Sequence, residues 1–134
     1  MSILEKLIND IMLVEDDPIT TMLTEMVIKR APRVQRVTPM KNGLSALREL
    51  QKRIHGNEDL PDLILLDINM PVMDGWDFLT EVGKLAPLEQ VPVVMLTSSV
   101  DPADIARASQ SSRVKAYLSK PVNVQALEKV LADL

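Results

Sequence analysis

The 134-residue sequence contains no cysteine, which excludes disulfide bonds, thiol catalysis and metal sites with cysteine ligands. It has one Trp, one Tyr and one Phe, so binding by aromatic stacking on bases or sugars is not expected. Its four glycines are scattered and form neither GxGxxG nor GxxxxGK(S/T), the loops that cradle nucleotide phosphates. A nucleotide-binding or flavin protein is therefore disfavoured.

Long apolar runs are missing as well. No stretch approaches the ~20 residues that span a bilayer, and the first ten residues lack the basic start and apolar run of a signal peptide. We therefore expect a cytoplasmic protein without a membrane segment. The net charge of -4 and the absence of a Lys/Arg cluster argue against nucleic acid as a partner. The length fits a single domain, residues 1–134.

Short apolar runs alternate along the chain with stretches of helical periodicity. The predicted strands are residues 11–14, 34–37, 63–66, 93–96 and 116–118. Each is followed by a stretch in which apolar residues recur at helical spacing, which gives five strands and five helices in strict alternation. This order predicts a doubly wound α/β fold with a parallel sheet.

The first predicted helix follows an acidic triplet. Asp17 is a natural N-cap, and Pro18 suits the first helical turn because its missing N–H is harmless there. Apolar residues then keep the i, i+3, i+4, i+7, i+8 spacing of one helix face, and we predict that this face is buried. Its members are Ile19, Met22, Leu23, Met26 and Val27.

Polar residues stand where four of the predicted strands end: the triplet 15–17, Asp67, Thr97 and Lys120. Ligands of open parallel sheets bind at the carboxyl ends of the strands. Clustered carboxylates repel one another unless a cation neutralises them, and Mg²⁺ is the hard divalent ion that best fits oxygen ligands. Thr97 and Lys120 could then hold two more oxygens of a phosphoryl group, so the pattern predicts phosphoryl transfer.

Each of these features has a simpler interpretation when it is taken alone. An acidic triplet before a helix is usually a cap on a solvated surface, a Lys-Pro pair is usually a turn, and Thr-Ser-Ser is usually a loop. Asp67 could itself cap a turn. Their occurrence together, at four separate strand ends, favours a shared site.

Four segments carry a resemblance that covers nearly the whole chain. They are MLVEDDP (12–18), DLILLDINMPVMDGWDFL (62–79), VPVVMLTSS (91–99) and AYLSKPV (116–122). In order and spacing they resemble the receiver domain of two-component response regulators, of the single-domain chemotaxis-regulator type. The resemblance implies a flavodoxin-like sheet of strand order 2-1-3-4-5 with five helices, and phosphorylation of the Asp that ends the third strand.

The resemblance also implies roles for individual residues. Asp67 would be the phosphoacceptor, and Mg²⁺ would be held by Asp16, by Glu15 through water, by Asp67 and by the carbonyl of Asn69. Thr97 resembles the switch hydroxyl, Tyr117 the switch aromatic, and Lys120 the lysine that pairs with acceptor and phosphate. The bond from this lysine to Pro121 is cis in family members.

Three further residues have less definite expected roles. Asp17 could contribute to the metal site, although its capping role is favoured. Ser98 follows the switch threonine and, being small, would leave the acceptor open to a partner. Ser99 and Asn69 occupy positions that tune the lifetime of the phosphoryl group in this family.

The expected partners also follow from the resemblance. The phosphodonor would be a sensor histidine kinase or a histidine phosphotransfer domain. Phosphorylation would change the face made by the fourth helix, the fifth strand and the fifth helix, and this face would contact a downstream protein. A homodimer is a further possibility that the resemblance leaves open. No output domain follows in the sequence, which favours a stand-alone regulator or phosphorelay intermediate, with an excised receiver as the alternative. Such a chain is a regulator, not an enzyme.

Two rival functions stay open at this point. A haloacid-dehalogenase-type phosphatase also uses a nucleophilic Asp with Mg²⁺, but it needs a second Asp where this chain has Asn69. A pseudo-receiver would keep the fold and bind partners without being phosphorylated. We expect Trp76 to be an anchor at the surface or in a loop, close enough to Asp67 to report on it by fluorescence.

Overall fold

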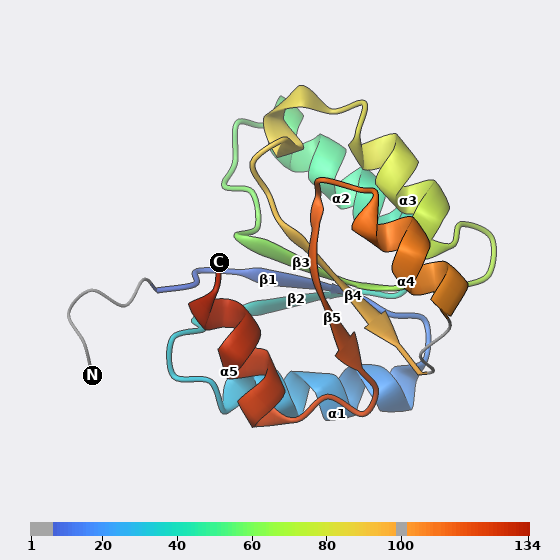
Figure 1. The fold of residues 1–134 in the computed structure, drawn as a ribbon. Coiled ribbons are helices and arrows are strands. Elements are labelled where there is room, and N and C mark those ends of the chain that lie inside the picture. Colours follow the sequence, from blue (N-terminus) through green and yellow to red (C-terminus); the bar gives the residue numbers. More distant parts are fainter. Residues whose placement is uncertain (1–6, 99–101) are drawn as a thin grey trace.

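A five-stranded parallel sheet forms the centre of the computed structural model, which describes residues 7–98 and 102–134 (Figure 1). The strand order is β2-β1-β3-β4-β5, the predicted flavodoxin-like order. The strands are β1 (Ile11–Val14), β2 (Val37–Met40), β3 (Leu63–Asp67), β4 (Val93–Thr97) and β5 (Val114–Ser119). Since every pairing is parallel, all five carboxyl ends lie along one edge of the sheet.

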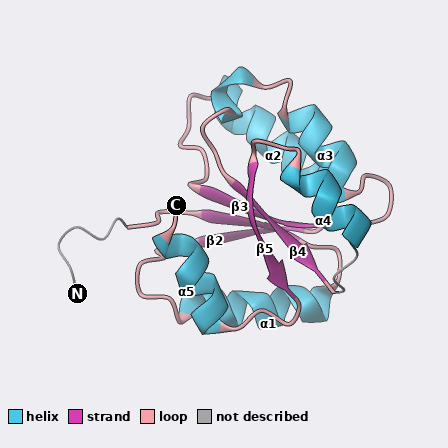
Figure 2. Cartoon of the chain, in the orientation of Figure 1, coloured by secondary structure: helices cyan, strands magenta, loops and turns pink. Residues whose placement is uncertain are grey.

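Helices cover both faces of this sheet (Figures 1 and 2). Helices α1 and α5 lie on one face, and α2, α3 and α4 lie on the other. Their bounds are α1 (Pro18–Lys29), α2 (Gly43–His55), α3 (Gly75–Val82), α4 (Pro102–Ser109) and α5 (Val124–Ala132), with a short 3₁₀ helix at Ala86–Leu88. Among the described residues, no helix combines the length and the apolar character required to span a bilayer.

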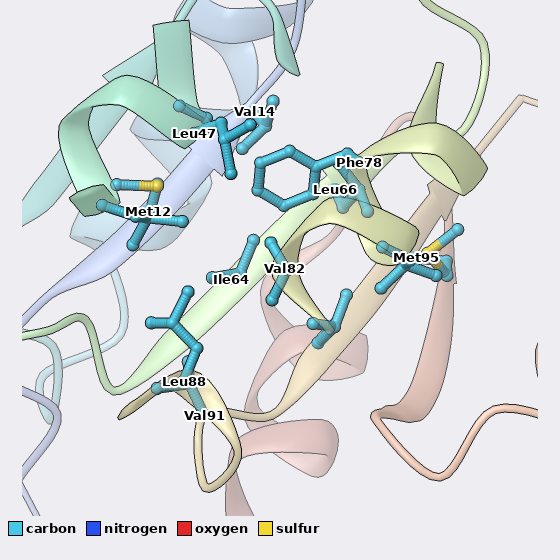
Figure 3. Packing of buried hydrophobic residues seen from close by; sticks show 14 of the residues in the cluster. Met12, Val14, Leu47, Ile64, Leu66, Phe78, Val82, Leu88, Val91 and Met95 are labelled. Carbon is cyan, nitrogen blue, oxygen red and sulfur yellow. The ribbon is translucent and has the colours of Figure 1, made fainter. Parts of the chain in front are cut away.

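The three central strands are buried along their whole length because helices pack on both sides of them. Alternate residues point to opposite faces. Ile64 and Leu66 of β3 contact the core beneath α2 and α3, where Phe78 also lies (Figure 3). Leu63 and Leu65 belong to the core beneath α1 and α5. Strand β3 is therefore held rigidly from both sides.

The prediction for the second strand, residues 34–37, is wrong. The strand is β2, in which Val37 pairs with Ile11 of β1 and Met40 pairs with Val14. Val34 forms only an isolated bridge with Ile8. Strand β2 lies at the edge of the sheet, where a proline such as the one at position 39 is tolerated, and its mixed composition lacks the apolar run that marks the central strands.

The prediction that the first apolar stripe is buried is also wrong. The residues of α1 that the core buries are Thr24 and Ile28. Helix α1 carries apolar residues on two faces, and periodicity alone does not say which face meets the sheet. Four residues of the predicted stripe are instead exposed, with relative accessibilities of 65% for Ile19, 56% for Met22, 48% for Leu23 and 52% for Met26.

Candidate functional site

A lysine bridges two buried carboxylates at the carboxyl edge of the sheet. The Nζ of Lys120 lies 2.8 Å from Oε1 of Glu15 and 3.0 Å from Oδ1 of Asp67. Both acidic residues are only 2% exposed. The backbone N–H of Lys120 donates a 2.7 Å hydrogen bond to the carbonyl of Thr97, which fixes the segment after β5 against the end of β4. The fold thus brings together the ends of β1, β3, β4 and β5.

A third carboxylate completes the group. Oxygens of Glu15, Asp16 and Asp67 all lie within 4.8 Å of one another, and Asp16 is exposed to solvent. Three carboxylates therefore lie together, and Lys120 forms ion pairs with two of them, Glu15 and Asp67. An all-oxygen donor set with one open side suits Mg²⁺, which keeps several water ligands. The residues present thus fit the predicted ion.

The charges in this group perturb one another. Burial raises the pKa of Glu15, and the neighbouring Asp67 carboxylate raises it further, while Lys120 opposes both effects. Burial alone would lower the pKa of Lys120, but its hydrogen bonds and ion pairs with Glu15 and Asp67 raise it instead. Glu15 thus carries a cost of ionisation that a divalent cation would relieve.

The backbone of Asp67 is pressed against the start of α3. A Cβ atom at Gly75 would lie 2.8 Å from the carbonyl oxygen of Asp67 and 2.9 Å from Cα of Ile68, closer than such atoms approach. Asp74 caps α3 by accepting a hydrogen bond from the N–H of Asp77. The role of Gly75 escaped the sequence analysis, although an Asp-Gly pair at a helix start was a usable signal.

The loop between Asp67 and α3 contains a strained residue. The N–H of Asn69 donates a 3.2 Å hydrogen bond to Oδ1 of Asp67. Val72 has a φ of 70° and is 92% exposed. A β-branched residue rarely adopts this left-handed conformation, and such strain is often found at functional sites. Nothing in the sequence pattern indicated it.

The two predicted switch residues come from neighbouring strands. Thr97 ends β4 and is buried. In the register of β4 with β5, Met95 pairs with Tyr117 and Thr97 pairs with Ser119. The hydroxyl of Tyr117 donates a 2.8 Å hydrogen bond to the carbonyl of Ile105 in α4. Tyr117 thus links the strand beside Thr97 to a helix on the surface.

The comparison with protein families decides the identity. The profile of the family described as response regulator receiver domain matches residues 11–132. The chain belongs to the response regulator receiver family. Receiver domains are phosphoacceptor switches of two-component systems; they bind Mg²⁺ and accept phosphoryl groups from histidine kinases.

Individual proteins similar to this chain are also response regulators. Response regulator Rcp1 of Synechocystis is 35% identical over 125 residues, covering 92% of this chain and 84% of Rcp1. A crystal structure of the Mn²⁺-bound form of Rcp1 is similar with a TM-score of 0.72 at 32% identity, covering 92% and 89% of the two chains. A two-component response regulator from Cytophaga hutchinsonii has a TM-score of 0.88 at 29% identity, covering 96% and 97%.

The remaining predicted residues can now be placed in this receiver domain. The Lys120–Pro121 peptide bond is cis, as the resemblance implied. Asp17 caps α1 by accepting a 2.8 Å hydrogen bond from the N–H of Thr20. A hydrogen bond from the Thr20 hydroxyl, together with the one from the N–H, holds the pKa of Asp17 below its usual value. Ser98 is exposed and, with Lys120, lines a hollow of about 510 Å³ beside α1. Ser99 lies outside the described residues.

Proposed function

We propose that Asp67 is the residue of this receiver domain that accepts the phosphoryl group, from a phosphohistidine of a sensor kinase or a histidine phosphotransfer domain. The observation that carries the proposal is the bridge from Lys120 to two buried carboxylates, with the carboxylate of Asp16 beside them. Glu15, Asp16, Asp67 and the carbonyl of Asn69 would hold Mg²⁺. The Mn²⁺-bound form of the relative Rcp1 supports a divalent ion here.

The transfer is a displacement at phosphorus. A carboxylate oxygen of Asp67 forms the new P–O bond as the P–N bond of the phosphohistidine breaks, and the imidazole nitrogen keeps the electron pair. Lys120 is close enough to Asp67 to stabilise the charge on the phosphoryl oxygens. When bound, Mg²⁺ supplies further neutralisation of that charge. Hydrolysis of the resulting acyl phosphate resets the switch.

The signal then passes through Thr97 and Tyr117. The hydroxyl of Thr97 turns toward the phosphoryl group, and Tyr117 follows into the space that this movement leaves. Its hydrogen bond to Ile105 is broken, so α4 is released from β5. The result is a shift between two populations of the α4–β5–α5 face, which we propose is read by a downstream protein or by a second copy of the chain.

The exposed face of α1 supports a protein phosphodonor over a small phosphoester. Ile19, Met22, Leu23 and Met26 are all about half exposed or more, and such apolar patches mark protein contacts. The hollow beside α1 is lined by Leu23 and Met26 and also by Lys120. A helical protein that covered this patch would therefore reach the acceptor. We further propose that residues 1–134 act as one receiver domain in the cytoplasm.

The direct test is to offer a phosphorylated histidine kinase to the chain and to its Asp67→Asn variant in Mg²⁺. We expect at least a hundredfold loss of acyl phosphate, measured by intact mass spectrometry, because the nucleophilic oxygen is replaced by an amide. Asp17→Asn is the matched control, since Asn caps a helix as well as Asp does and this residue should not be needed. Phosphorylation of Asp67→Asn at the normal rate would refute the assignment.

The contribution of α1 is tested with Met22→Asp. We expect at least a tenfold slower transfer from a protein phosphodonor, because a charge would be placed in the apolar contact. Phosphorylation by acetyl phosphate should be unchanged, since this small donor needs no docking surface. Leu134→Asp alters another exposed apolar residue and should affect neither reaction. Equal slowing with both donors would show that α1 is not a docking surface.

A further inference from the structure

Helix α4 is attached to the protein differently from the other helices on its face of the sheet (Figure 1). Helix α2 buries Ala46, Leu47 and Leu50, and α3 buries Phe78. In α4 the side chains of residues 102–107 are described, and none of them is buried. Because buried apolar area supplies most packing energy, this part of α4 depends on contacts at its surface.

Two such contacts hold α4, one with β5 and one with α3. The carbonyl of Ile105 accepts the hydrogen bond from Tyr117 of β5. Two residues later, the guanidinium carbon of Arg107 lies 4.5 Å from the centroid of the Trp76 ring in α3. A cation at this distance over an aromatic face is attracted by the ring, and Trp is the strongest partner. Within one turn, α4 is thus joined to both β5 and α3.

The two partners in this second contact differ in burial. Trp76 is 9% exposed and packs in the core beneath α2 and α3, so the expectation of an anchor at the surface or in a loop is wrong. Its neighbour Gly75 lies directly against the backbone of Asp67. The Trp76 ring is therefore packed into the core next to Asp67, whereas Arg107 lies exposed on α4.

We propose that the contact of Arg107 with Trp76 is a latch that holds α4 against α3 before phosphorylation and sets how readily the α4–β5–α5 face changes. This inference rests on the proposed function, in which Tyr117 leaves Ile105. The latch is then a contact that α4 must still lose in order to move, so its strength enters the equilibrium between the two states. A contact of this kind at a partly exposed position changes such an equilibrium about two- to fivefold.

The test compares the full chain with Arg107→Gln, Arg107→Lys and a control, Lys129→Gln, which removes an exposed cation from α5. The first measurement is hydrogen exchange of the α4 amides without any phosphoryl mimic. The second is the affinity for beryllofluoride in Mg²⁺, followed by fluorescence of the single tryptophan, Trp76. We expect Arg107→Gln to speed exchange and to tighten beryllofluoride binding, each about two- to fivefold.

Arg107→Lys keeps the cation and should stay close to the original chain, as should Lys129→Gln. Trp76→Phe should speed α4 exchange less than Arg107→Gln does. Adding it to Arg107→Gln should change α4 exchange no further, because the two residues act as one pair. Unchanged exchange in Arg107→Gln, or equal effects of Arg107→Gln and Lys129→Gln, would overturn the latch. Failure of the original chain to bind beryllofluoride would overturn the proposed function, and α4 exchange would still decide the latch.

Discussion

Asp10 precedes β1 and Asp67 ends β3, so these two buried carboxylates lie at opposite edges of one parallel sheet. Asp10 accepts hydrogen bonds from Arg53 at 2.8 Å, from Thr38 at 2.8 Å and from Arg36 at 3.2 Å. Burial alone would raise the pKa of Asp10, but these three donors hold it below the usual value. The cluster at this edge is satisfied within the chain.

The opposite edge of the sheet also combines carboxylates with a cation, but there the carboxylates are in excess. There Lys120 is the cation that contacts Glu15 and Asp67, and Asp16 adds a third carboxylate. The pKa of Glu15 is raised, whereas that of Asp10 is lowered. The difference teaches that a buried carboxylate has a structural role where cationic and hydroxyl donors balance its charge. Where carboxylates outnumber the cations, as around Lys120, a buried carboxylate is available for chemistry.

The largest expected effect on stability comes from breaking the matched cluster. Asp10→Asn should lower the free energy of unfolding by about 3 kcal/mol, because the buried Arg53 loses its shorter ion pair and keeps only the one with Glu49. Urea denaturation measures this loss. The double variant Asp10→Leu with Arg53→Met should cost less, since it removes both charges. If Asp10→Asn lost no more free energy of unfolding than the double variant, the ion pair between Asp10 and Arg53 would not explain the loss. Phosphorylation of Asp67 should survive in both.

A smaller effect on stability is expected when Mg²⁺ binds to the cluster of Glu15, Asp16 and Asp67. At a Mg²⁺ concentration of 100 times the dissociation constant, the original chain should gain about 2.7 kcal/mol of stability. Glu15→Gln should be more stable than the original chain without metal at neutral pH, because an acid with a raised pKa is removed. It should also bind Mg²⁺ more weakly, as followed by thermal melting. If Glu15→Gln were less stable than the original chain without metal, the cluster would not contain an excess of carboxylates over cations.

The two clusters should also give opposite dependence on pH, which serves as a control for both variants. Asp10 has a lowered pKa, so its stabilisation is present above its ordinary value of 3.8 and is lost as the pH falls through the folded value. Glu15 has a raised pKa, so metal-free stability decreases as the pH rises from its ordinary value of 4.5 through the folded one. In a plot of the free energy of unfolding against pH, Asp10→Asn should remove only the loss at low pH. Glu15→Gln should remove only the decrease as the pH rises.

The smallest effect concerns one backbone position at each edge. Val72, in the loop after Asp67, and Asn57, in the loop after α2, both have positive φ. Asn tolerates this conformation and Val does not. Val72→Asn should therefore raise the free energy of unfolding by about 1 kcal/mol, and Asn57→Val should lower it by about as much, in urea denaturation. Destabilisation by Val72→Asn would show that the loop is held by contacts of the valine itself.

The contrast between the two edges was only half visible in the sequence. Asp67 ends a strand with a strong apolar run and Lys120 follows another predicted strand, so their position at the same edge of the sheet could be predicted. Asp10 and Arg53 are 43 residues apart and carry no such marker. Their pairing depends on where α2 lies against β1, which periodicity does not reveal.

The sequence by itself determined the order of the elements, the central strands and the polar residues at their ends, because runs and spacing are local properties of the chain. Tertiary structure alone decided that β2 begins at Val37, that Trp76 is buried, and that the apolar stripe of α1 containing Met22 faces solvent. In each case the chain offered two acceptable faces or registers. The choice was made by the neighbours that packing supplies, and these lie far away in the sequence.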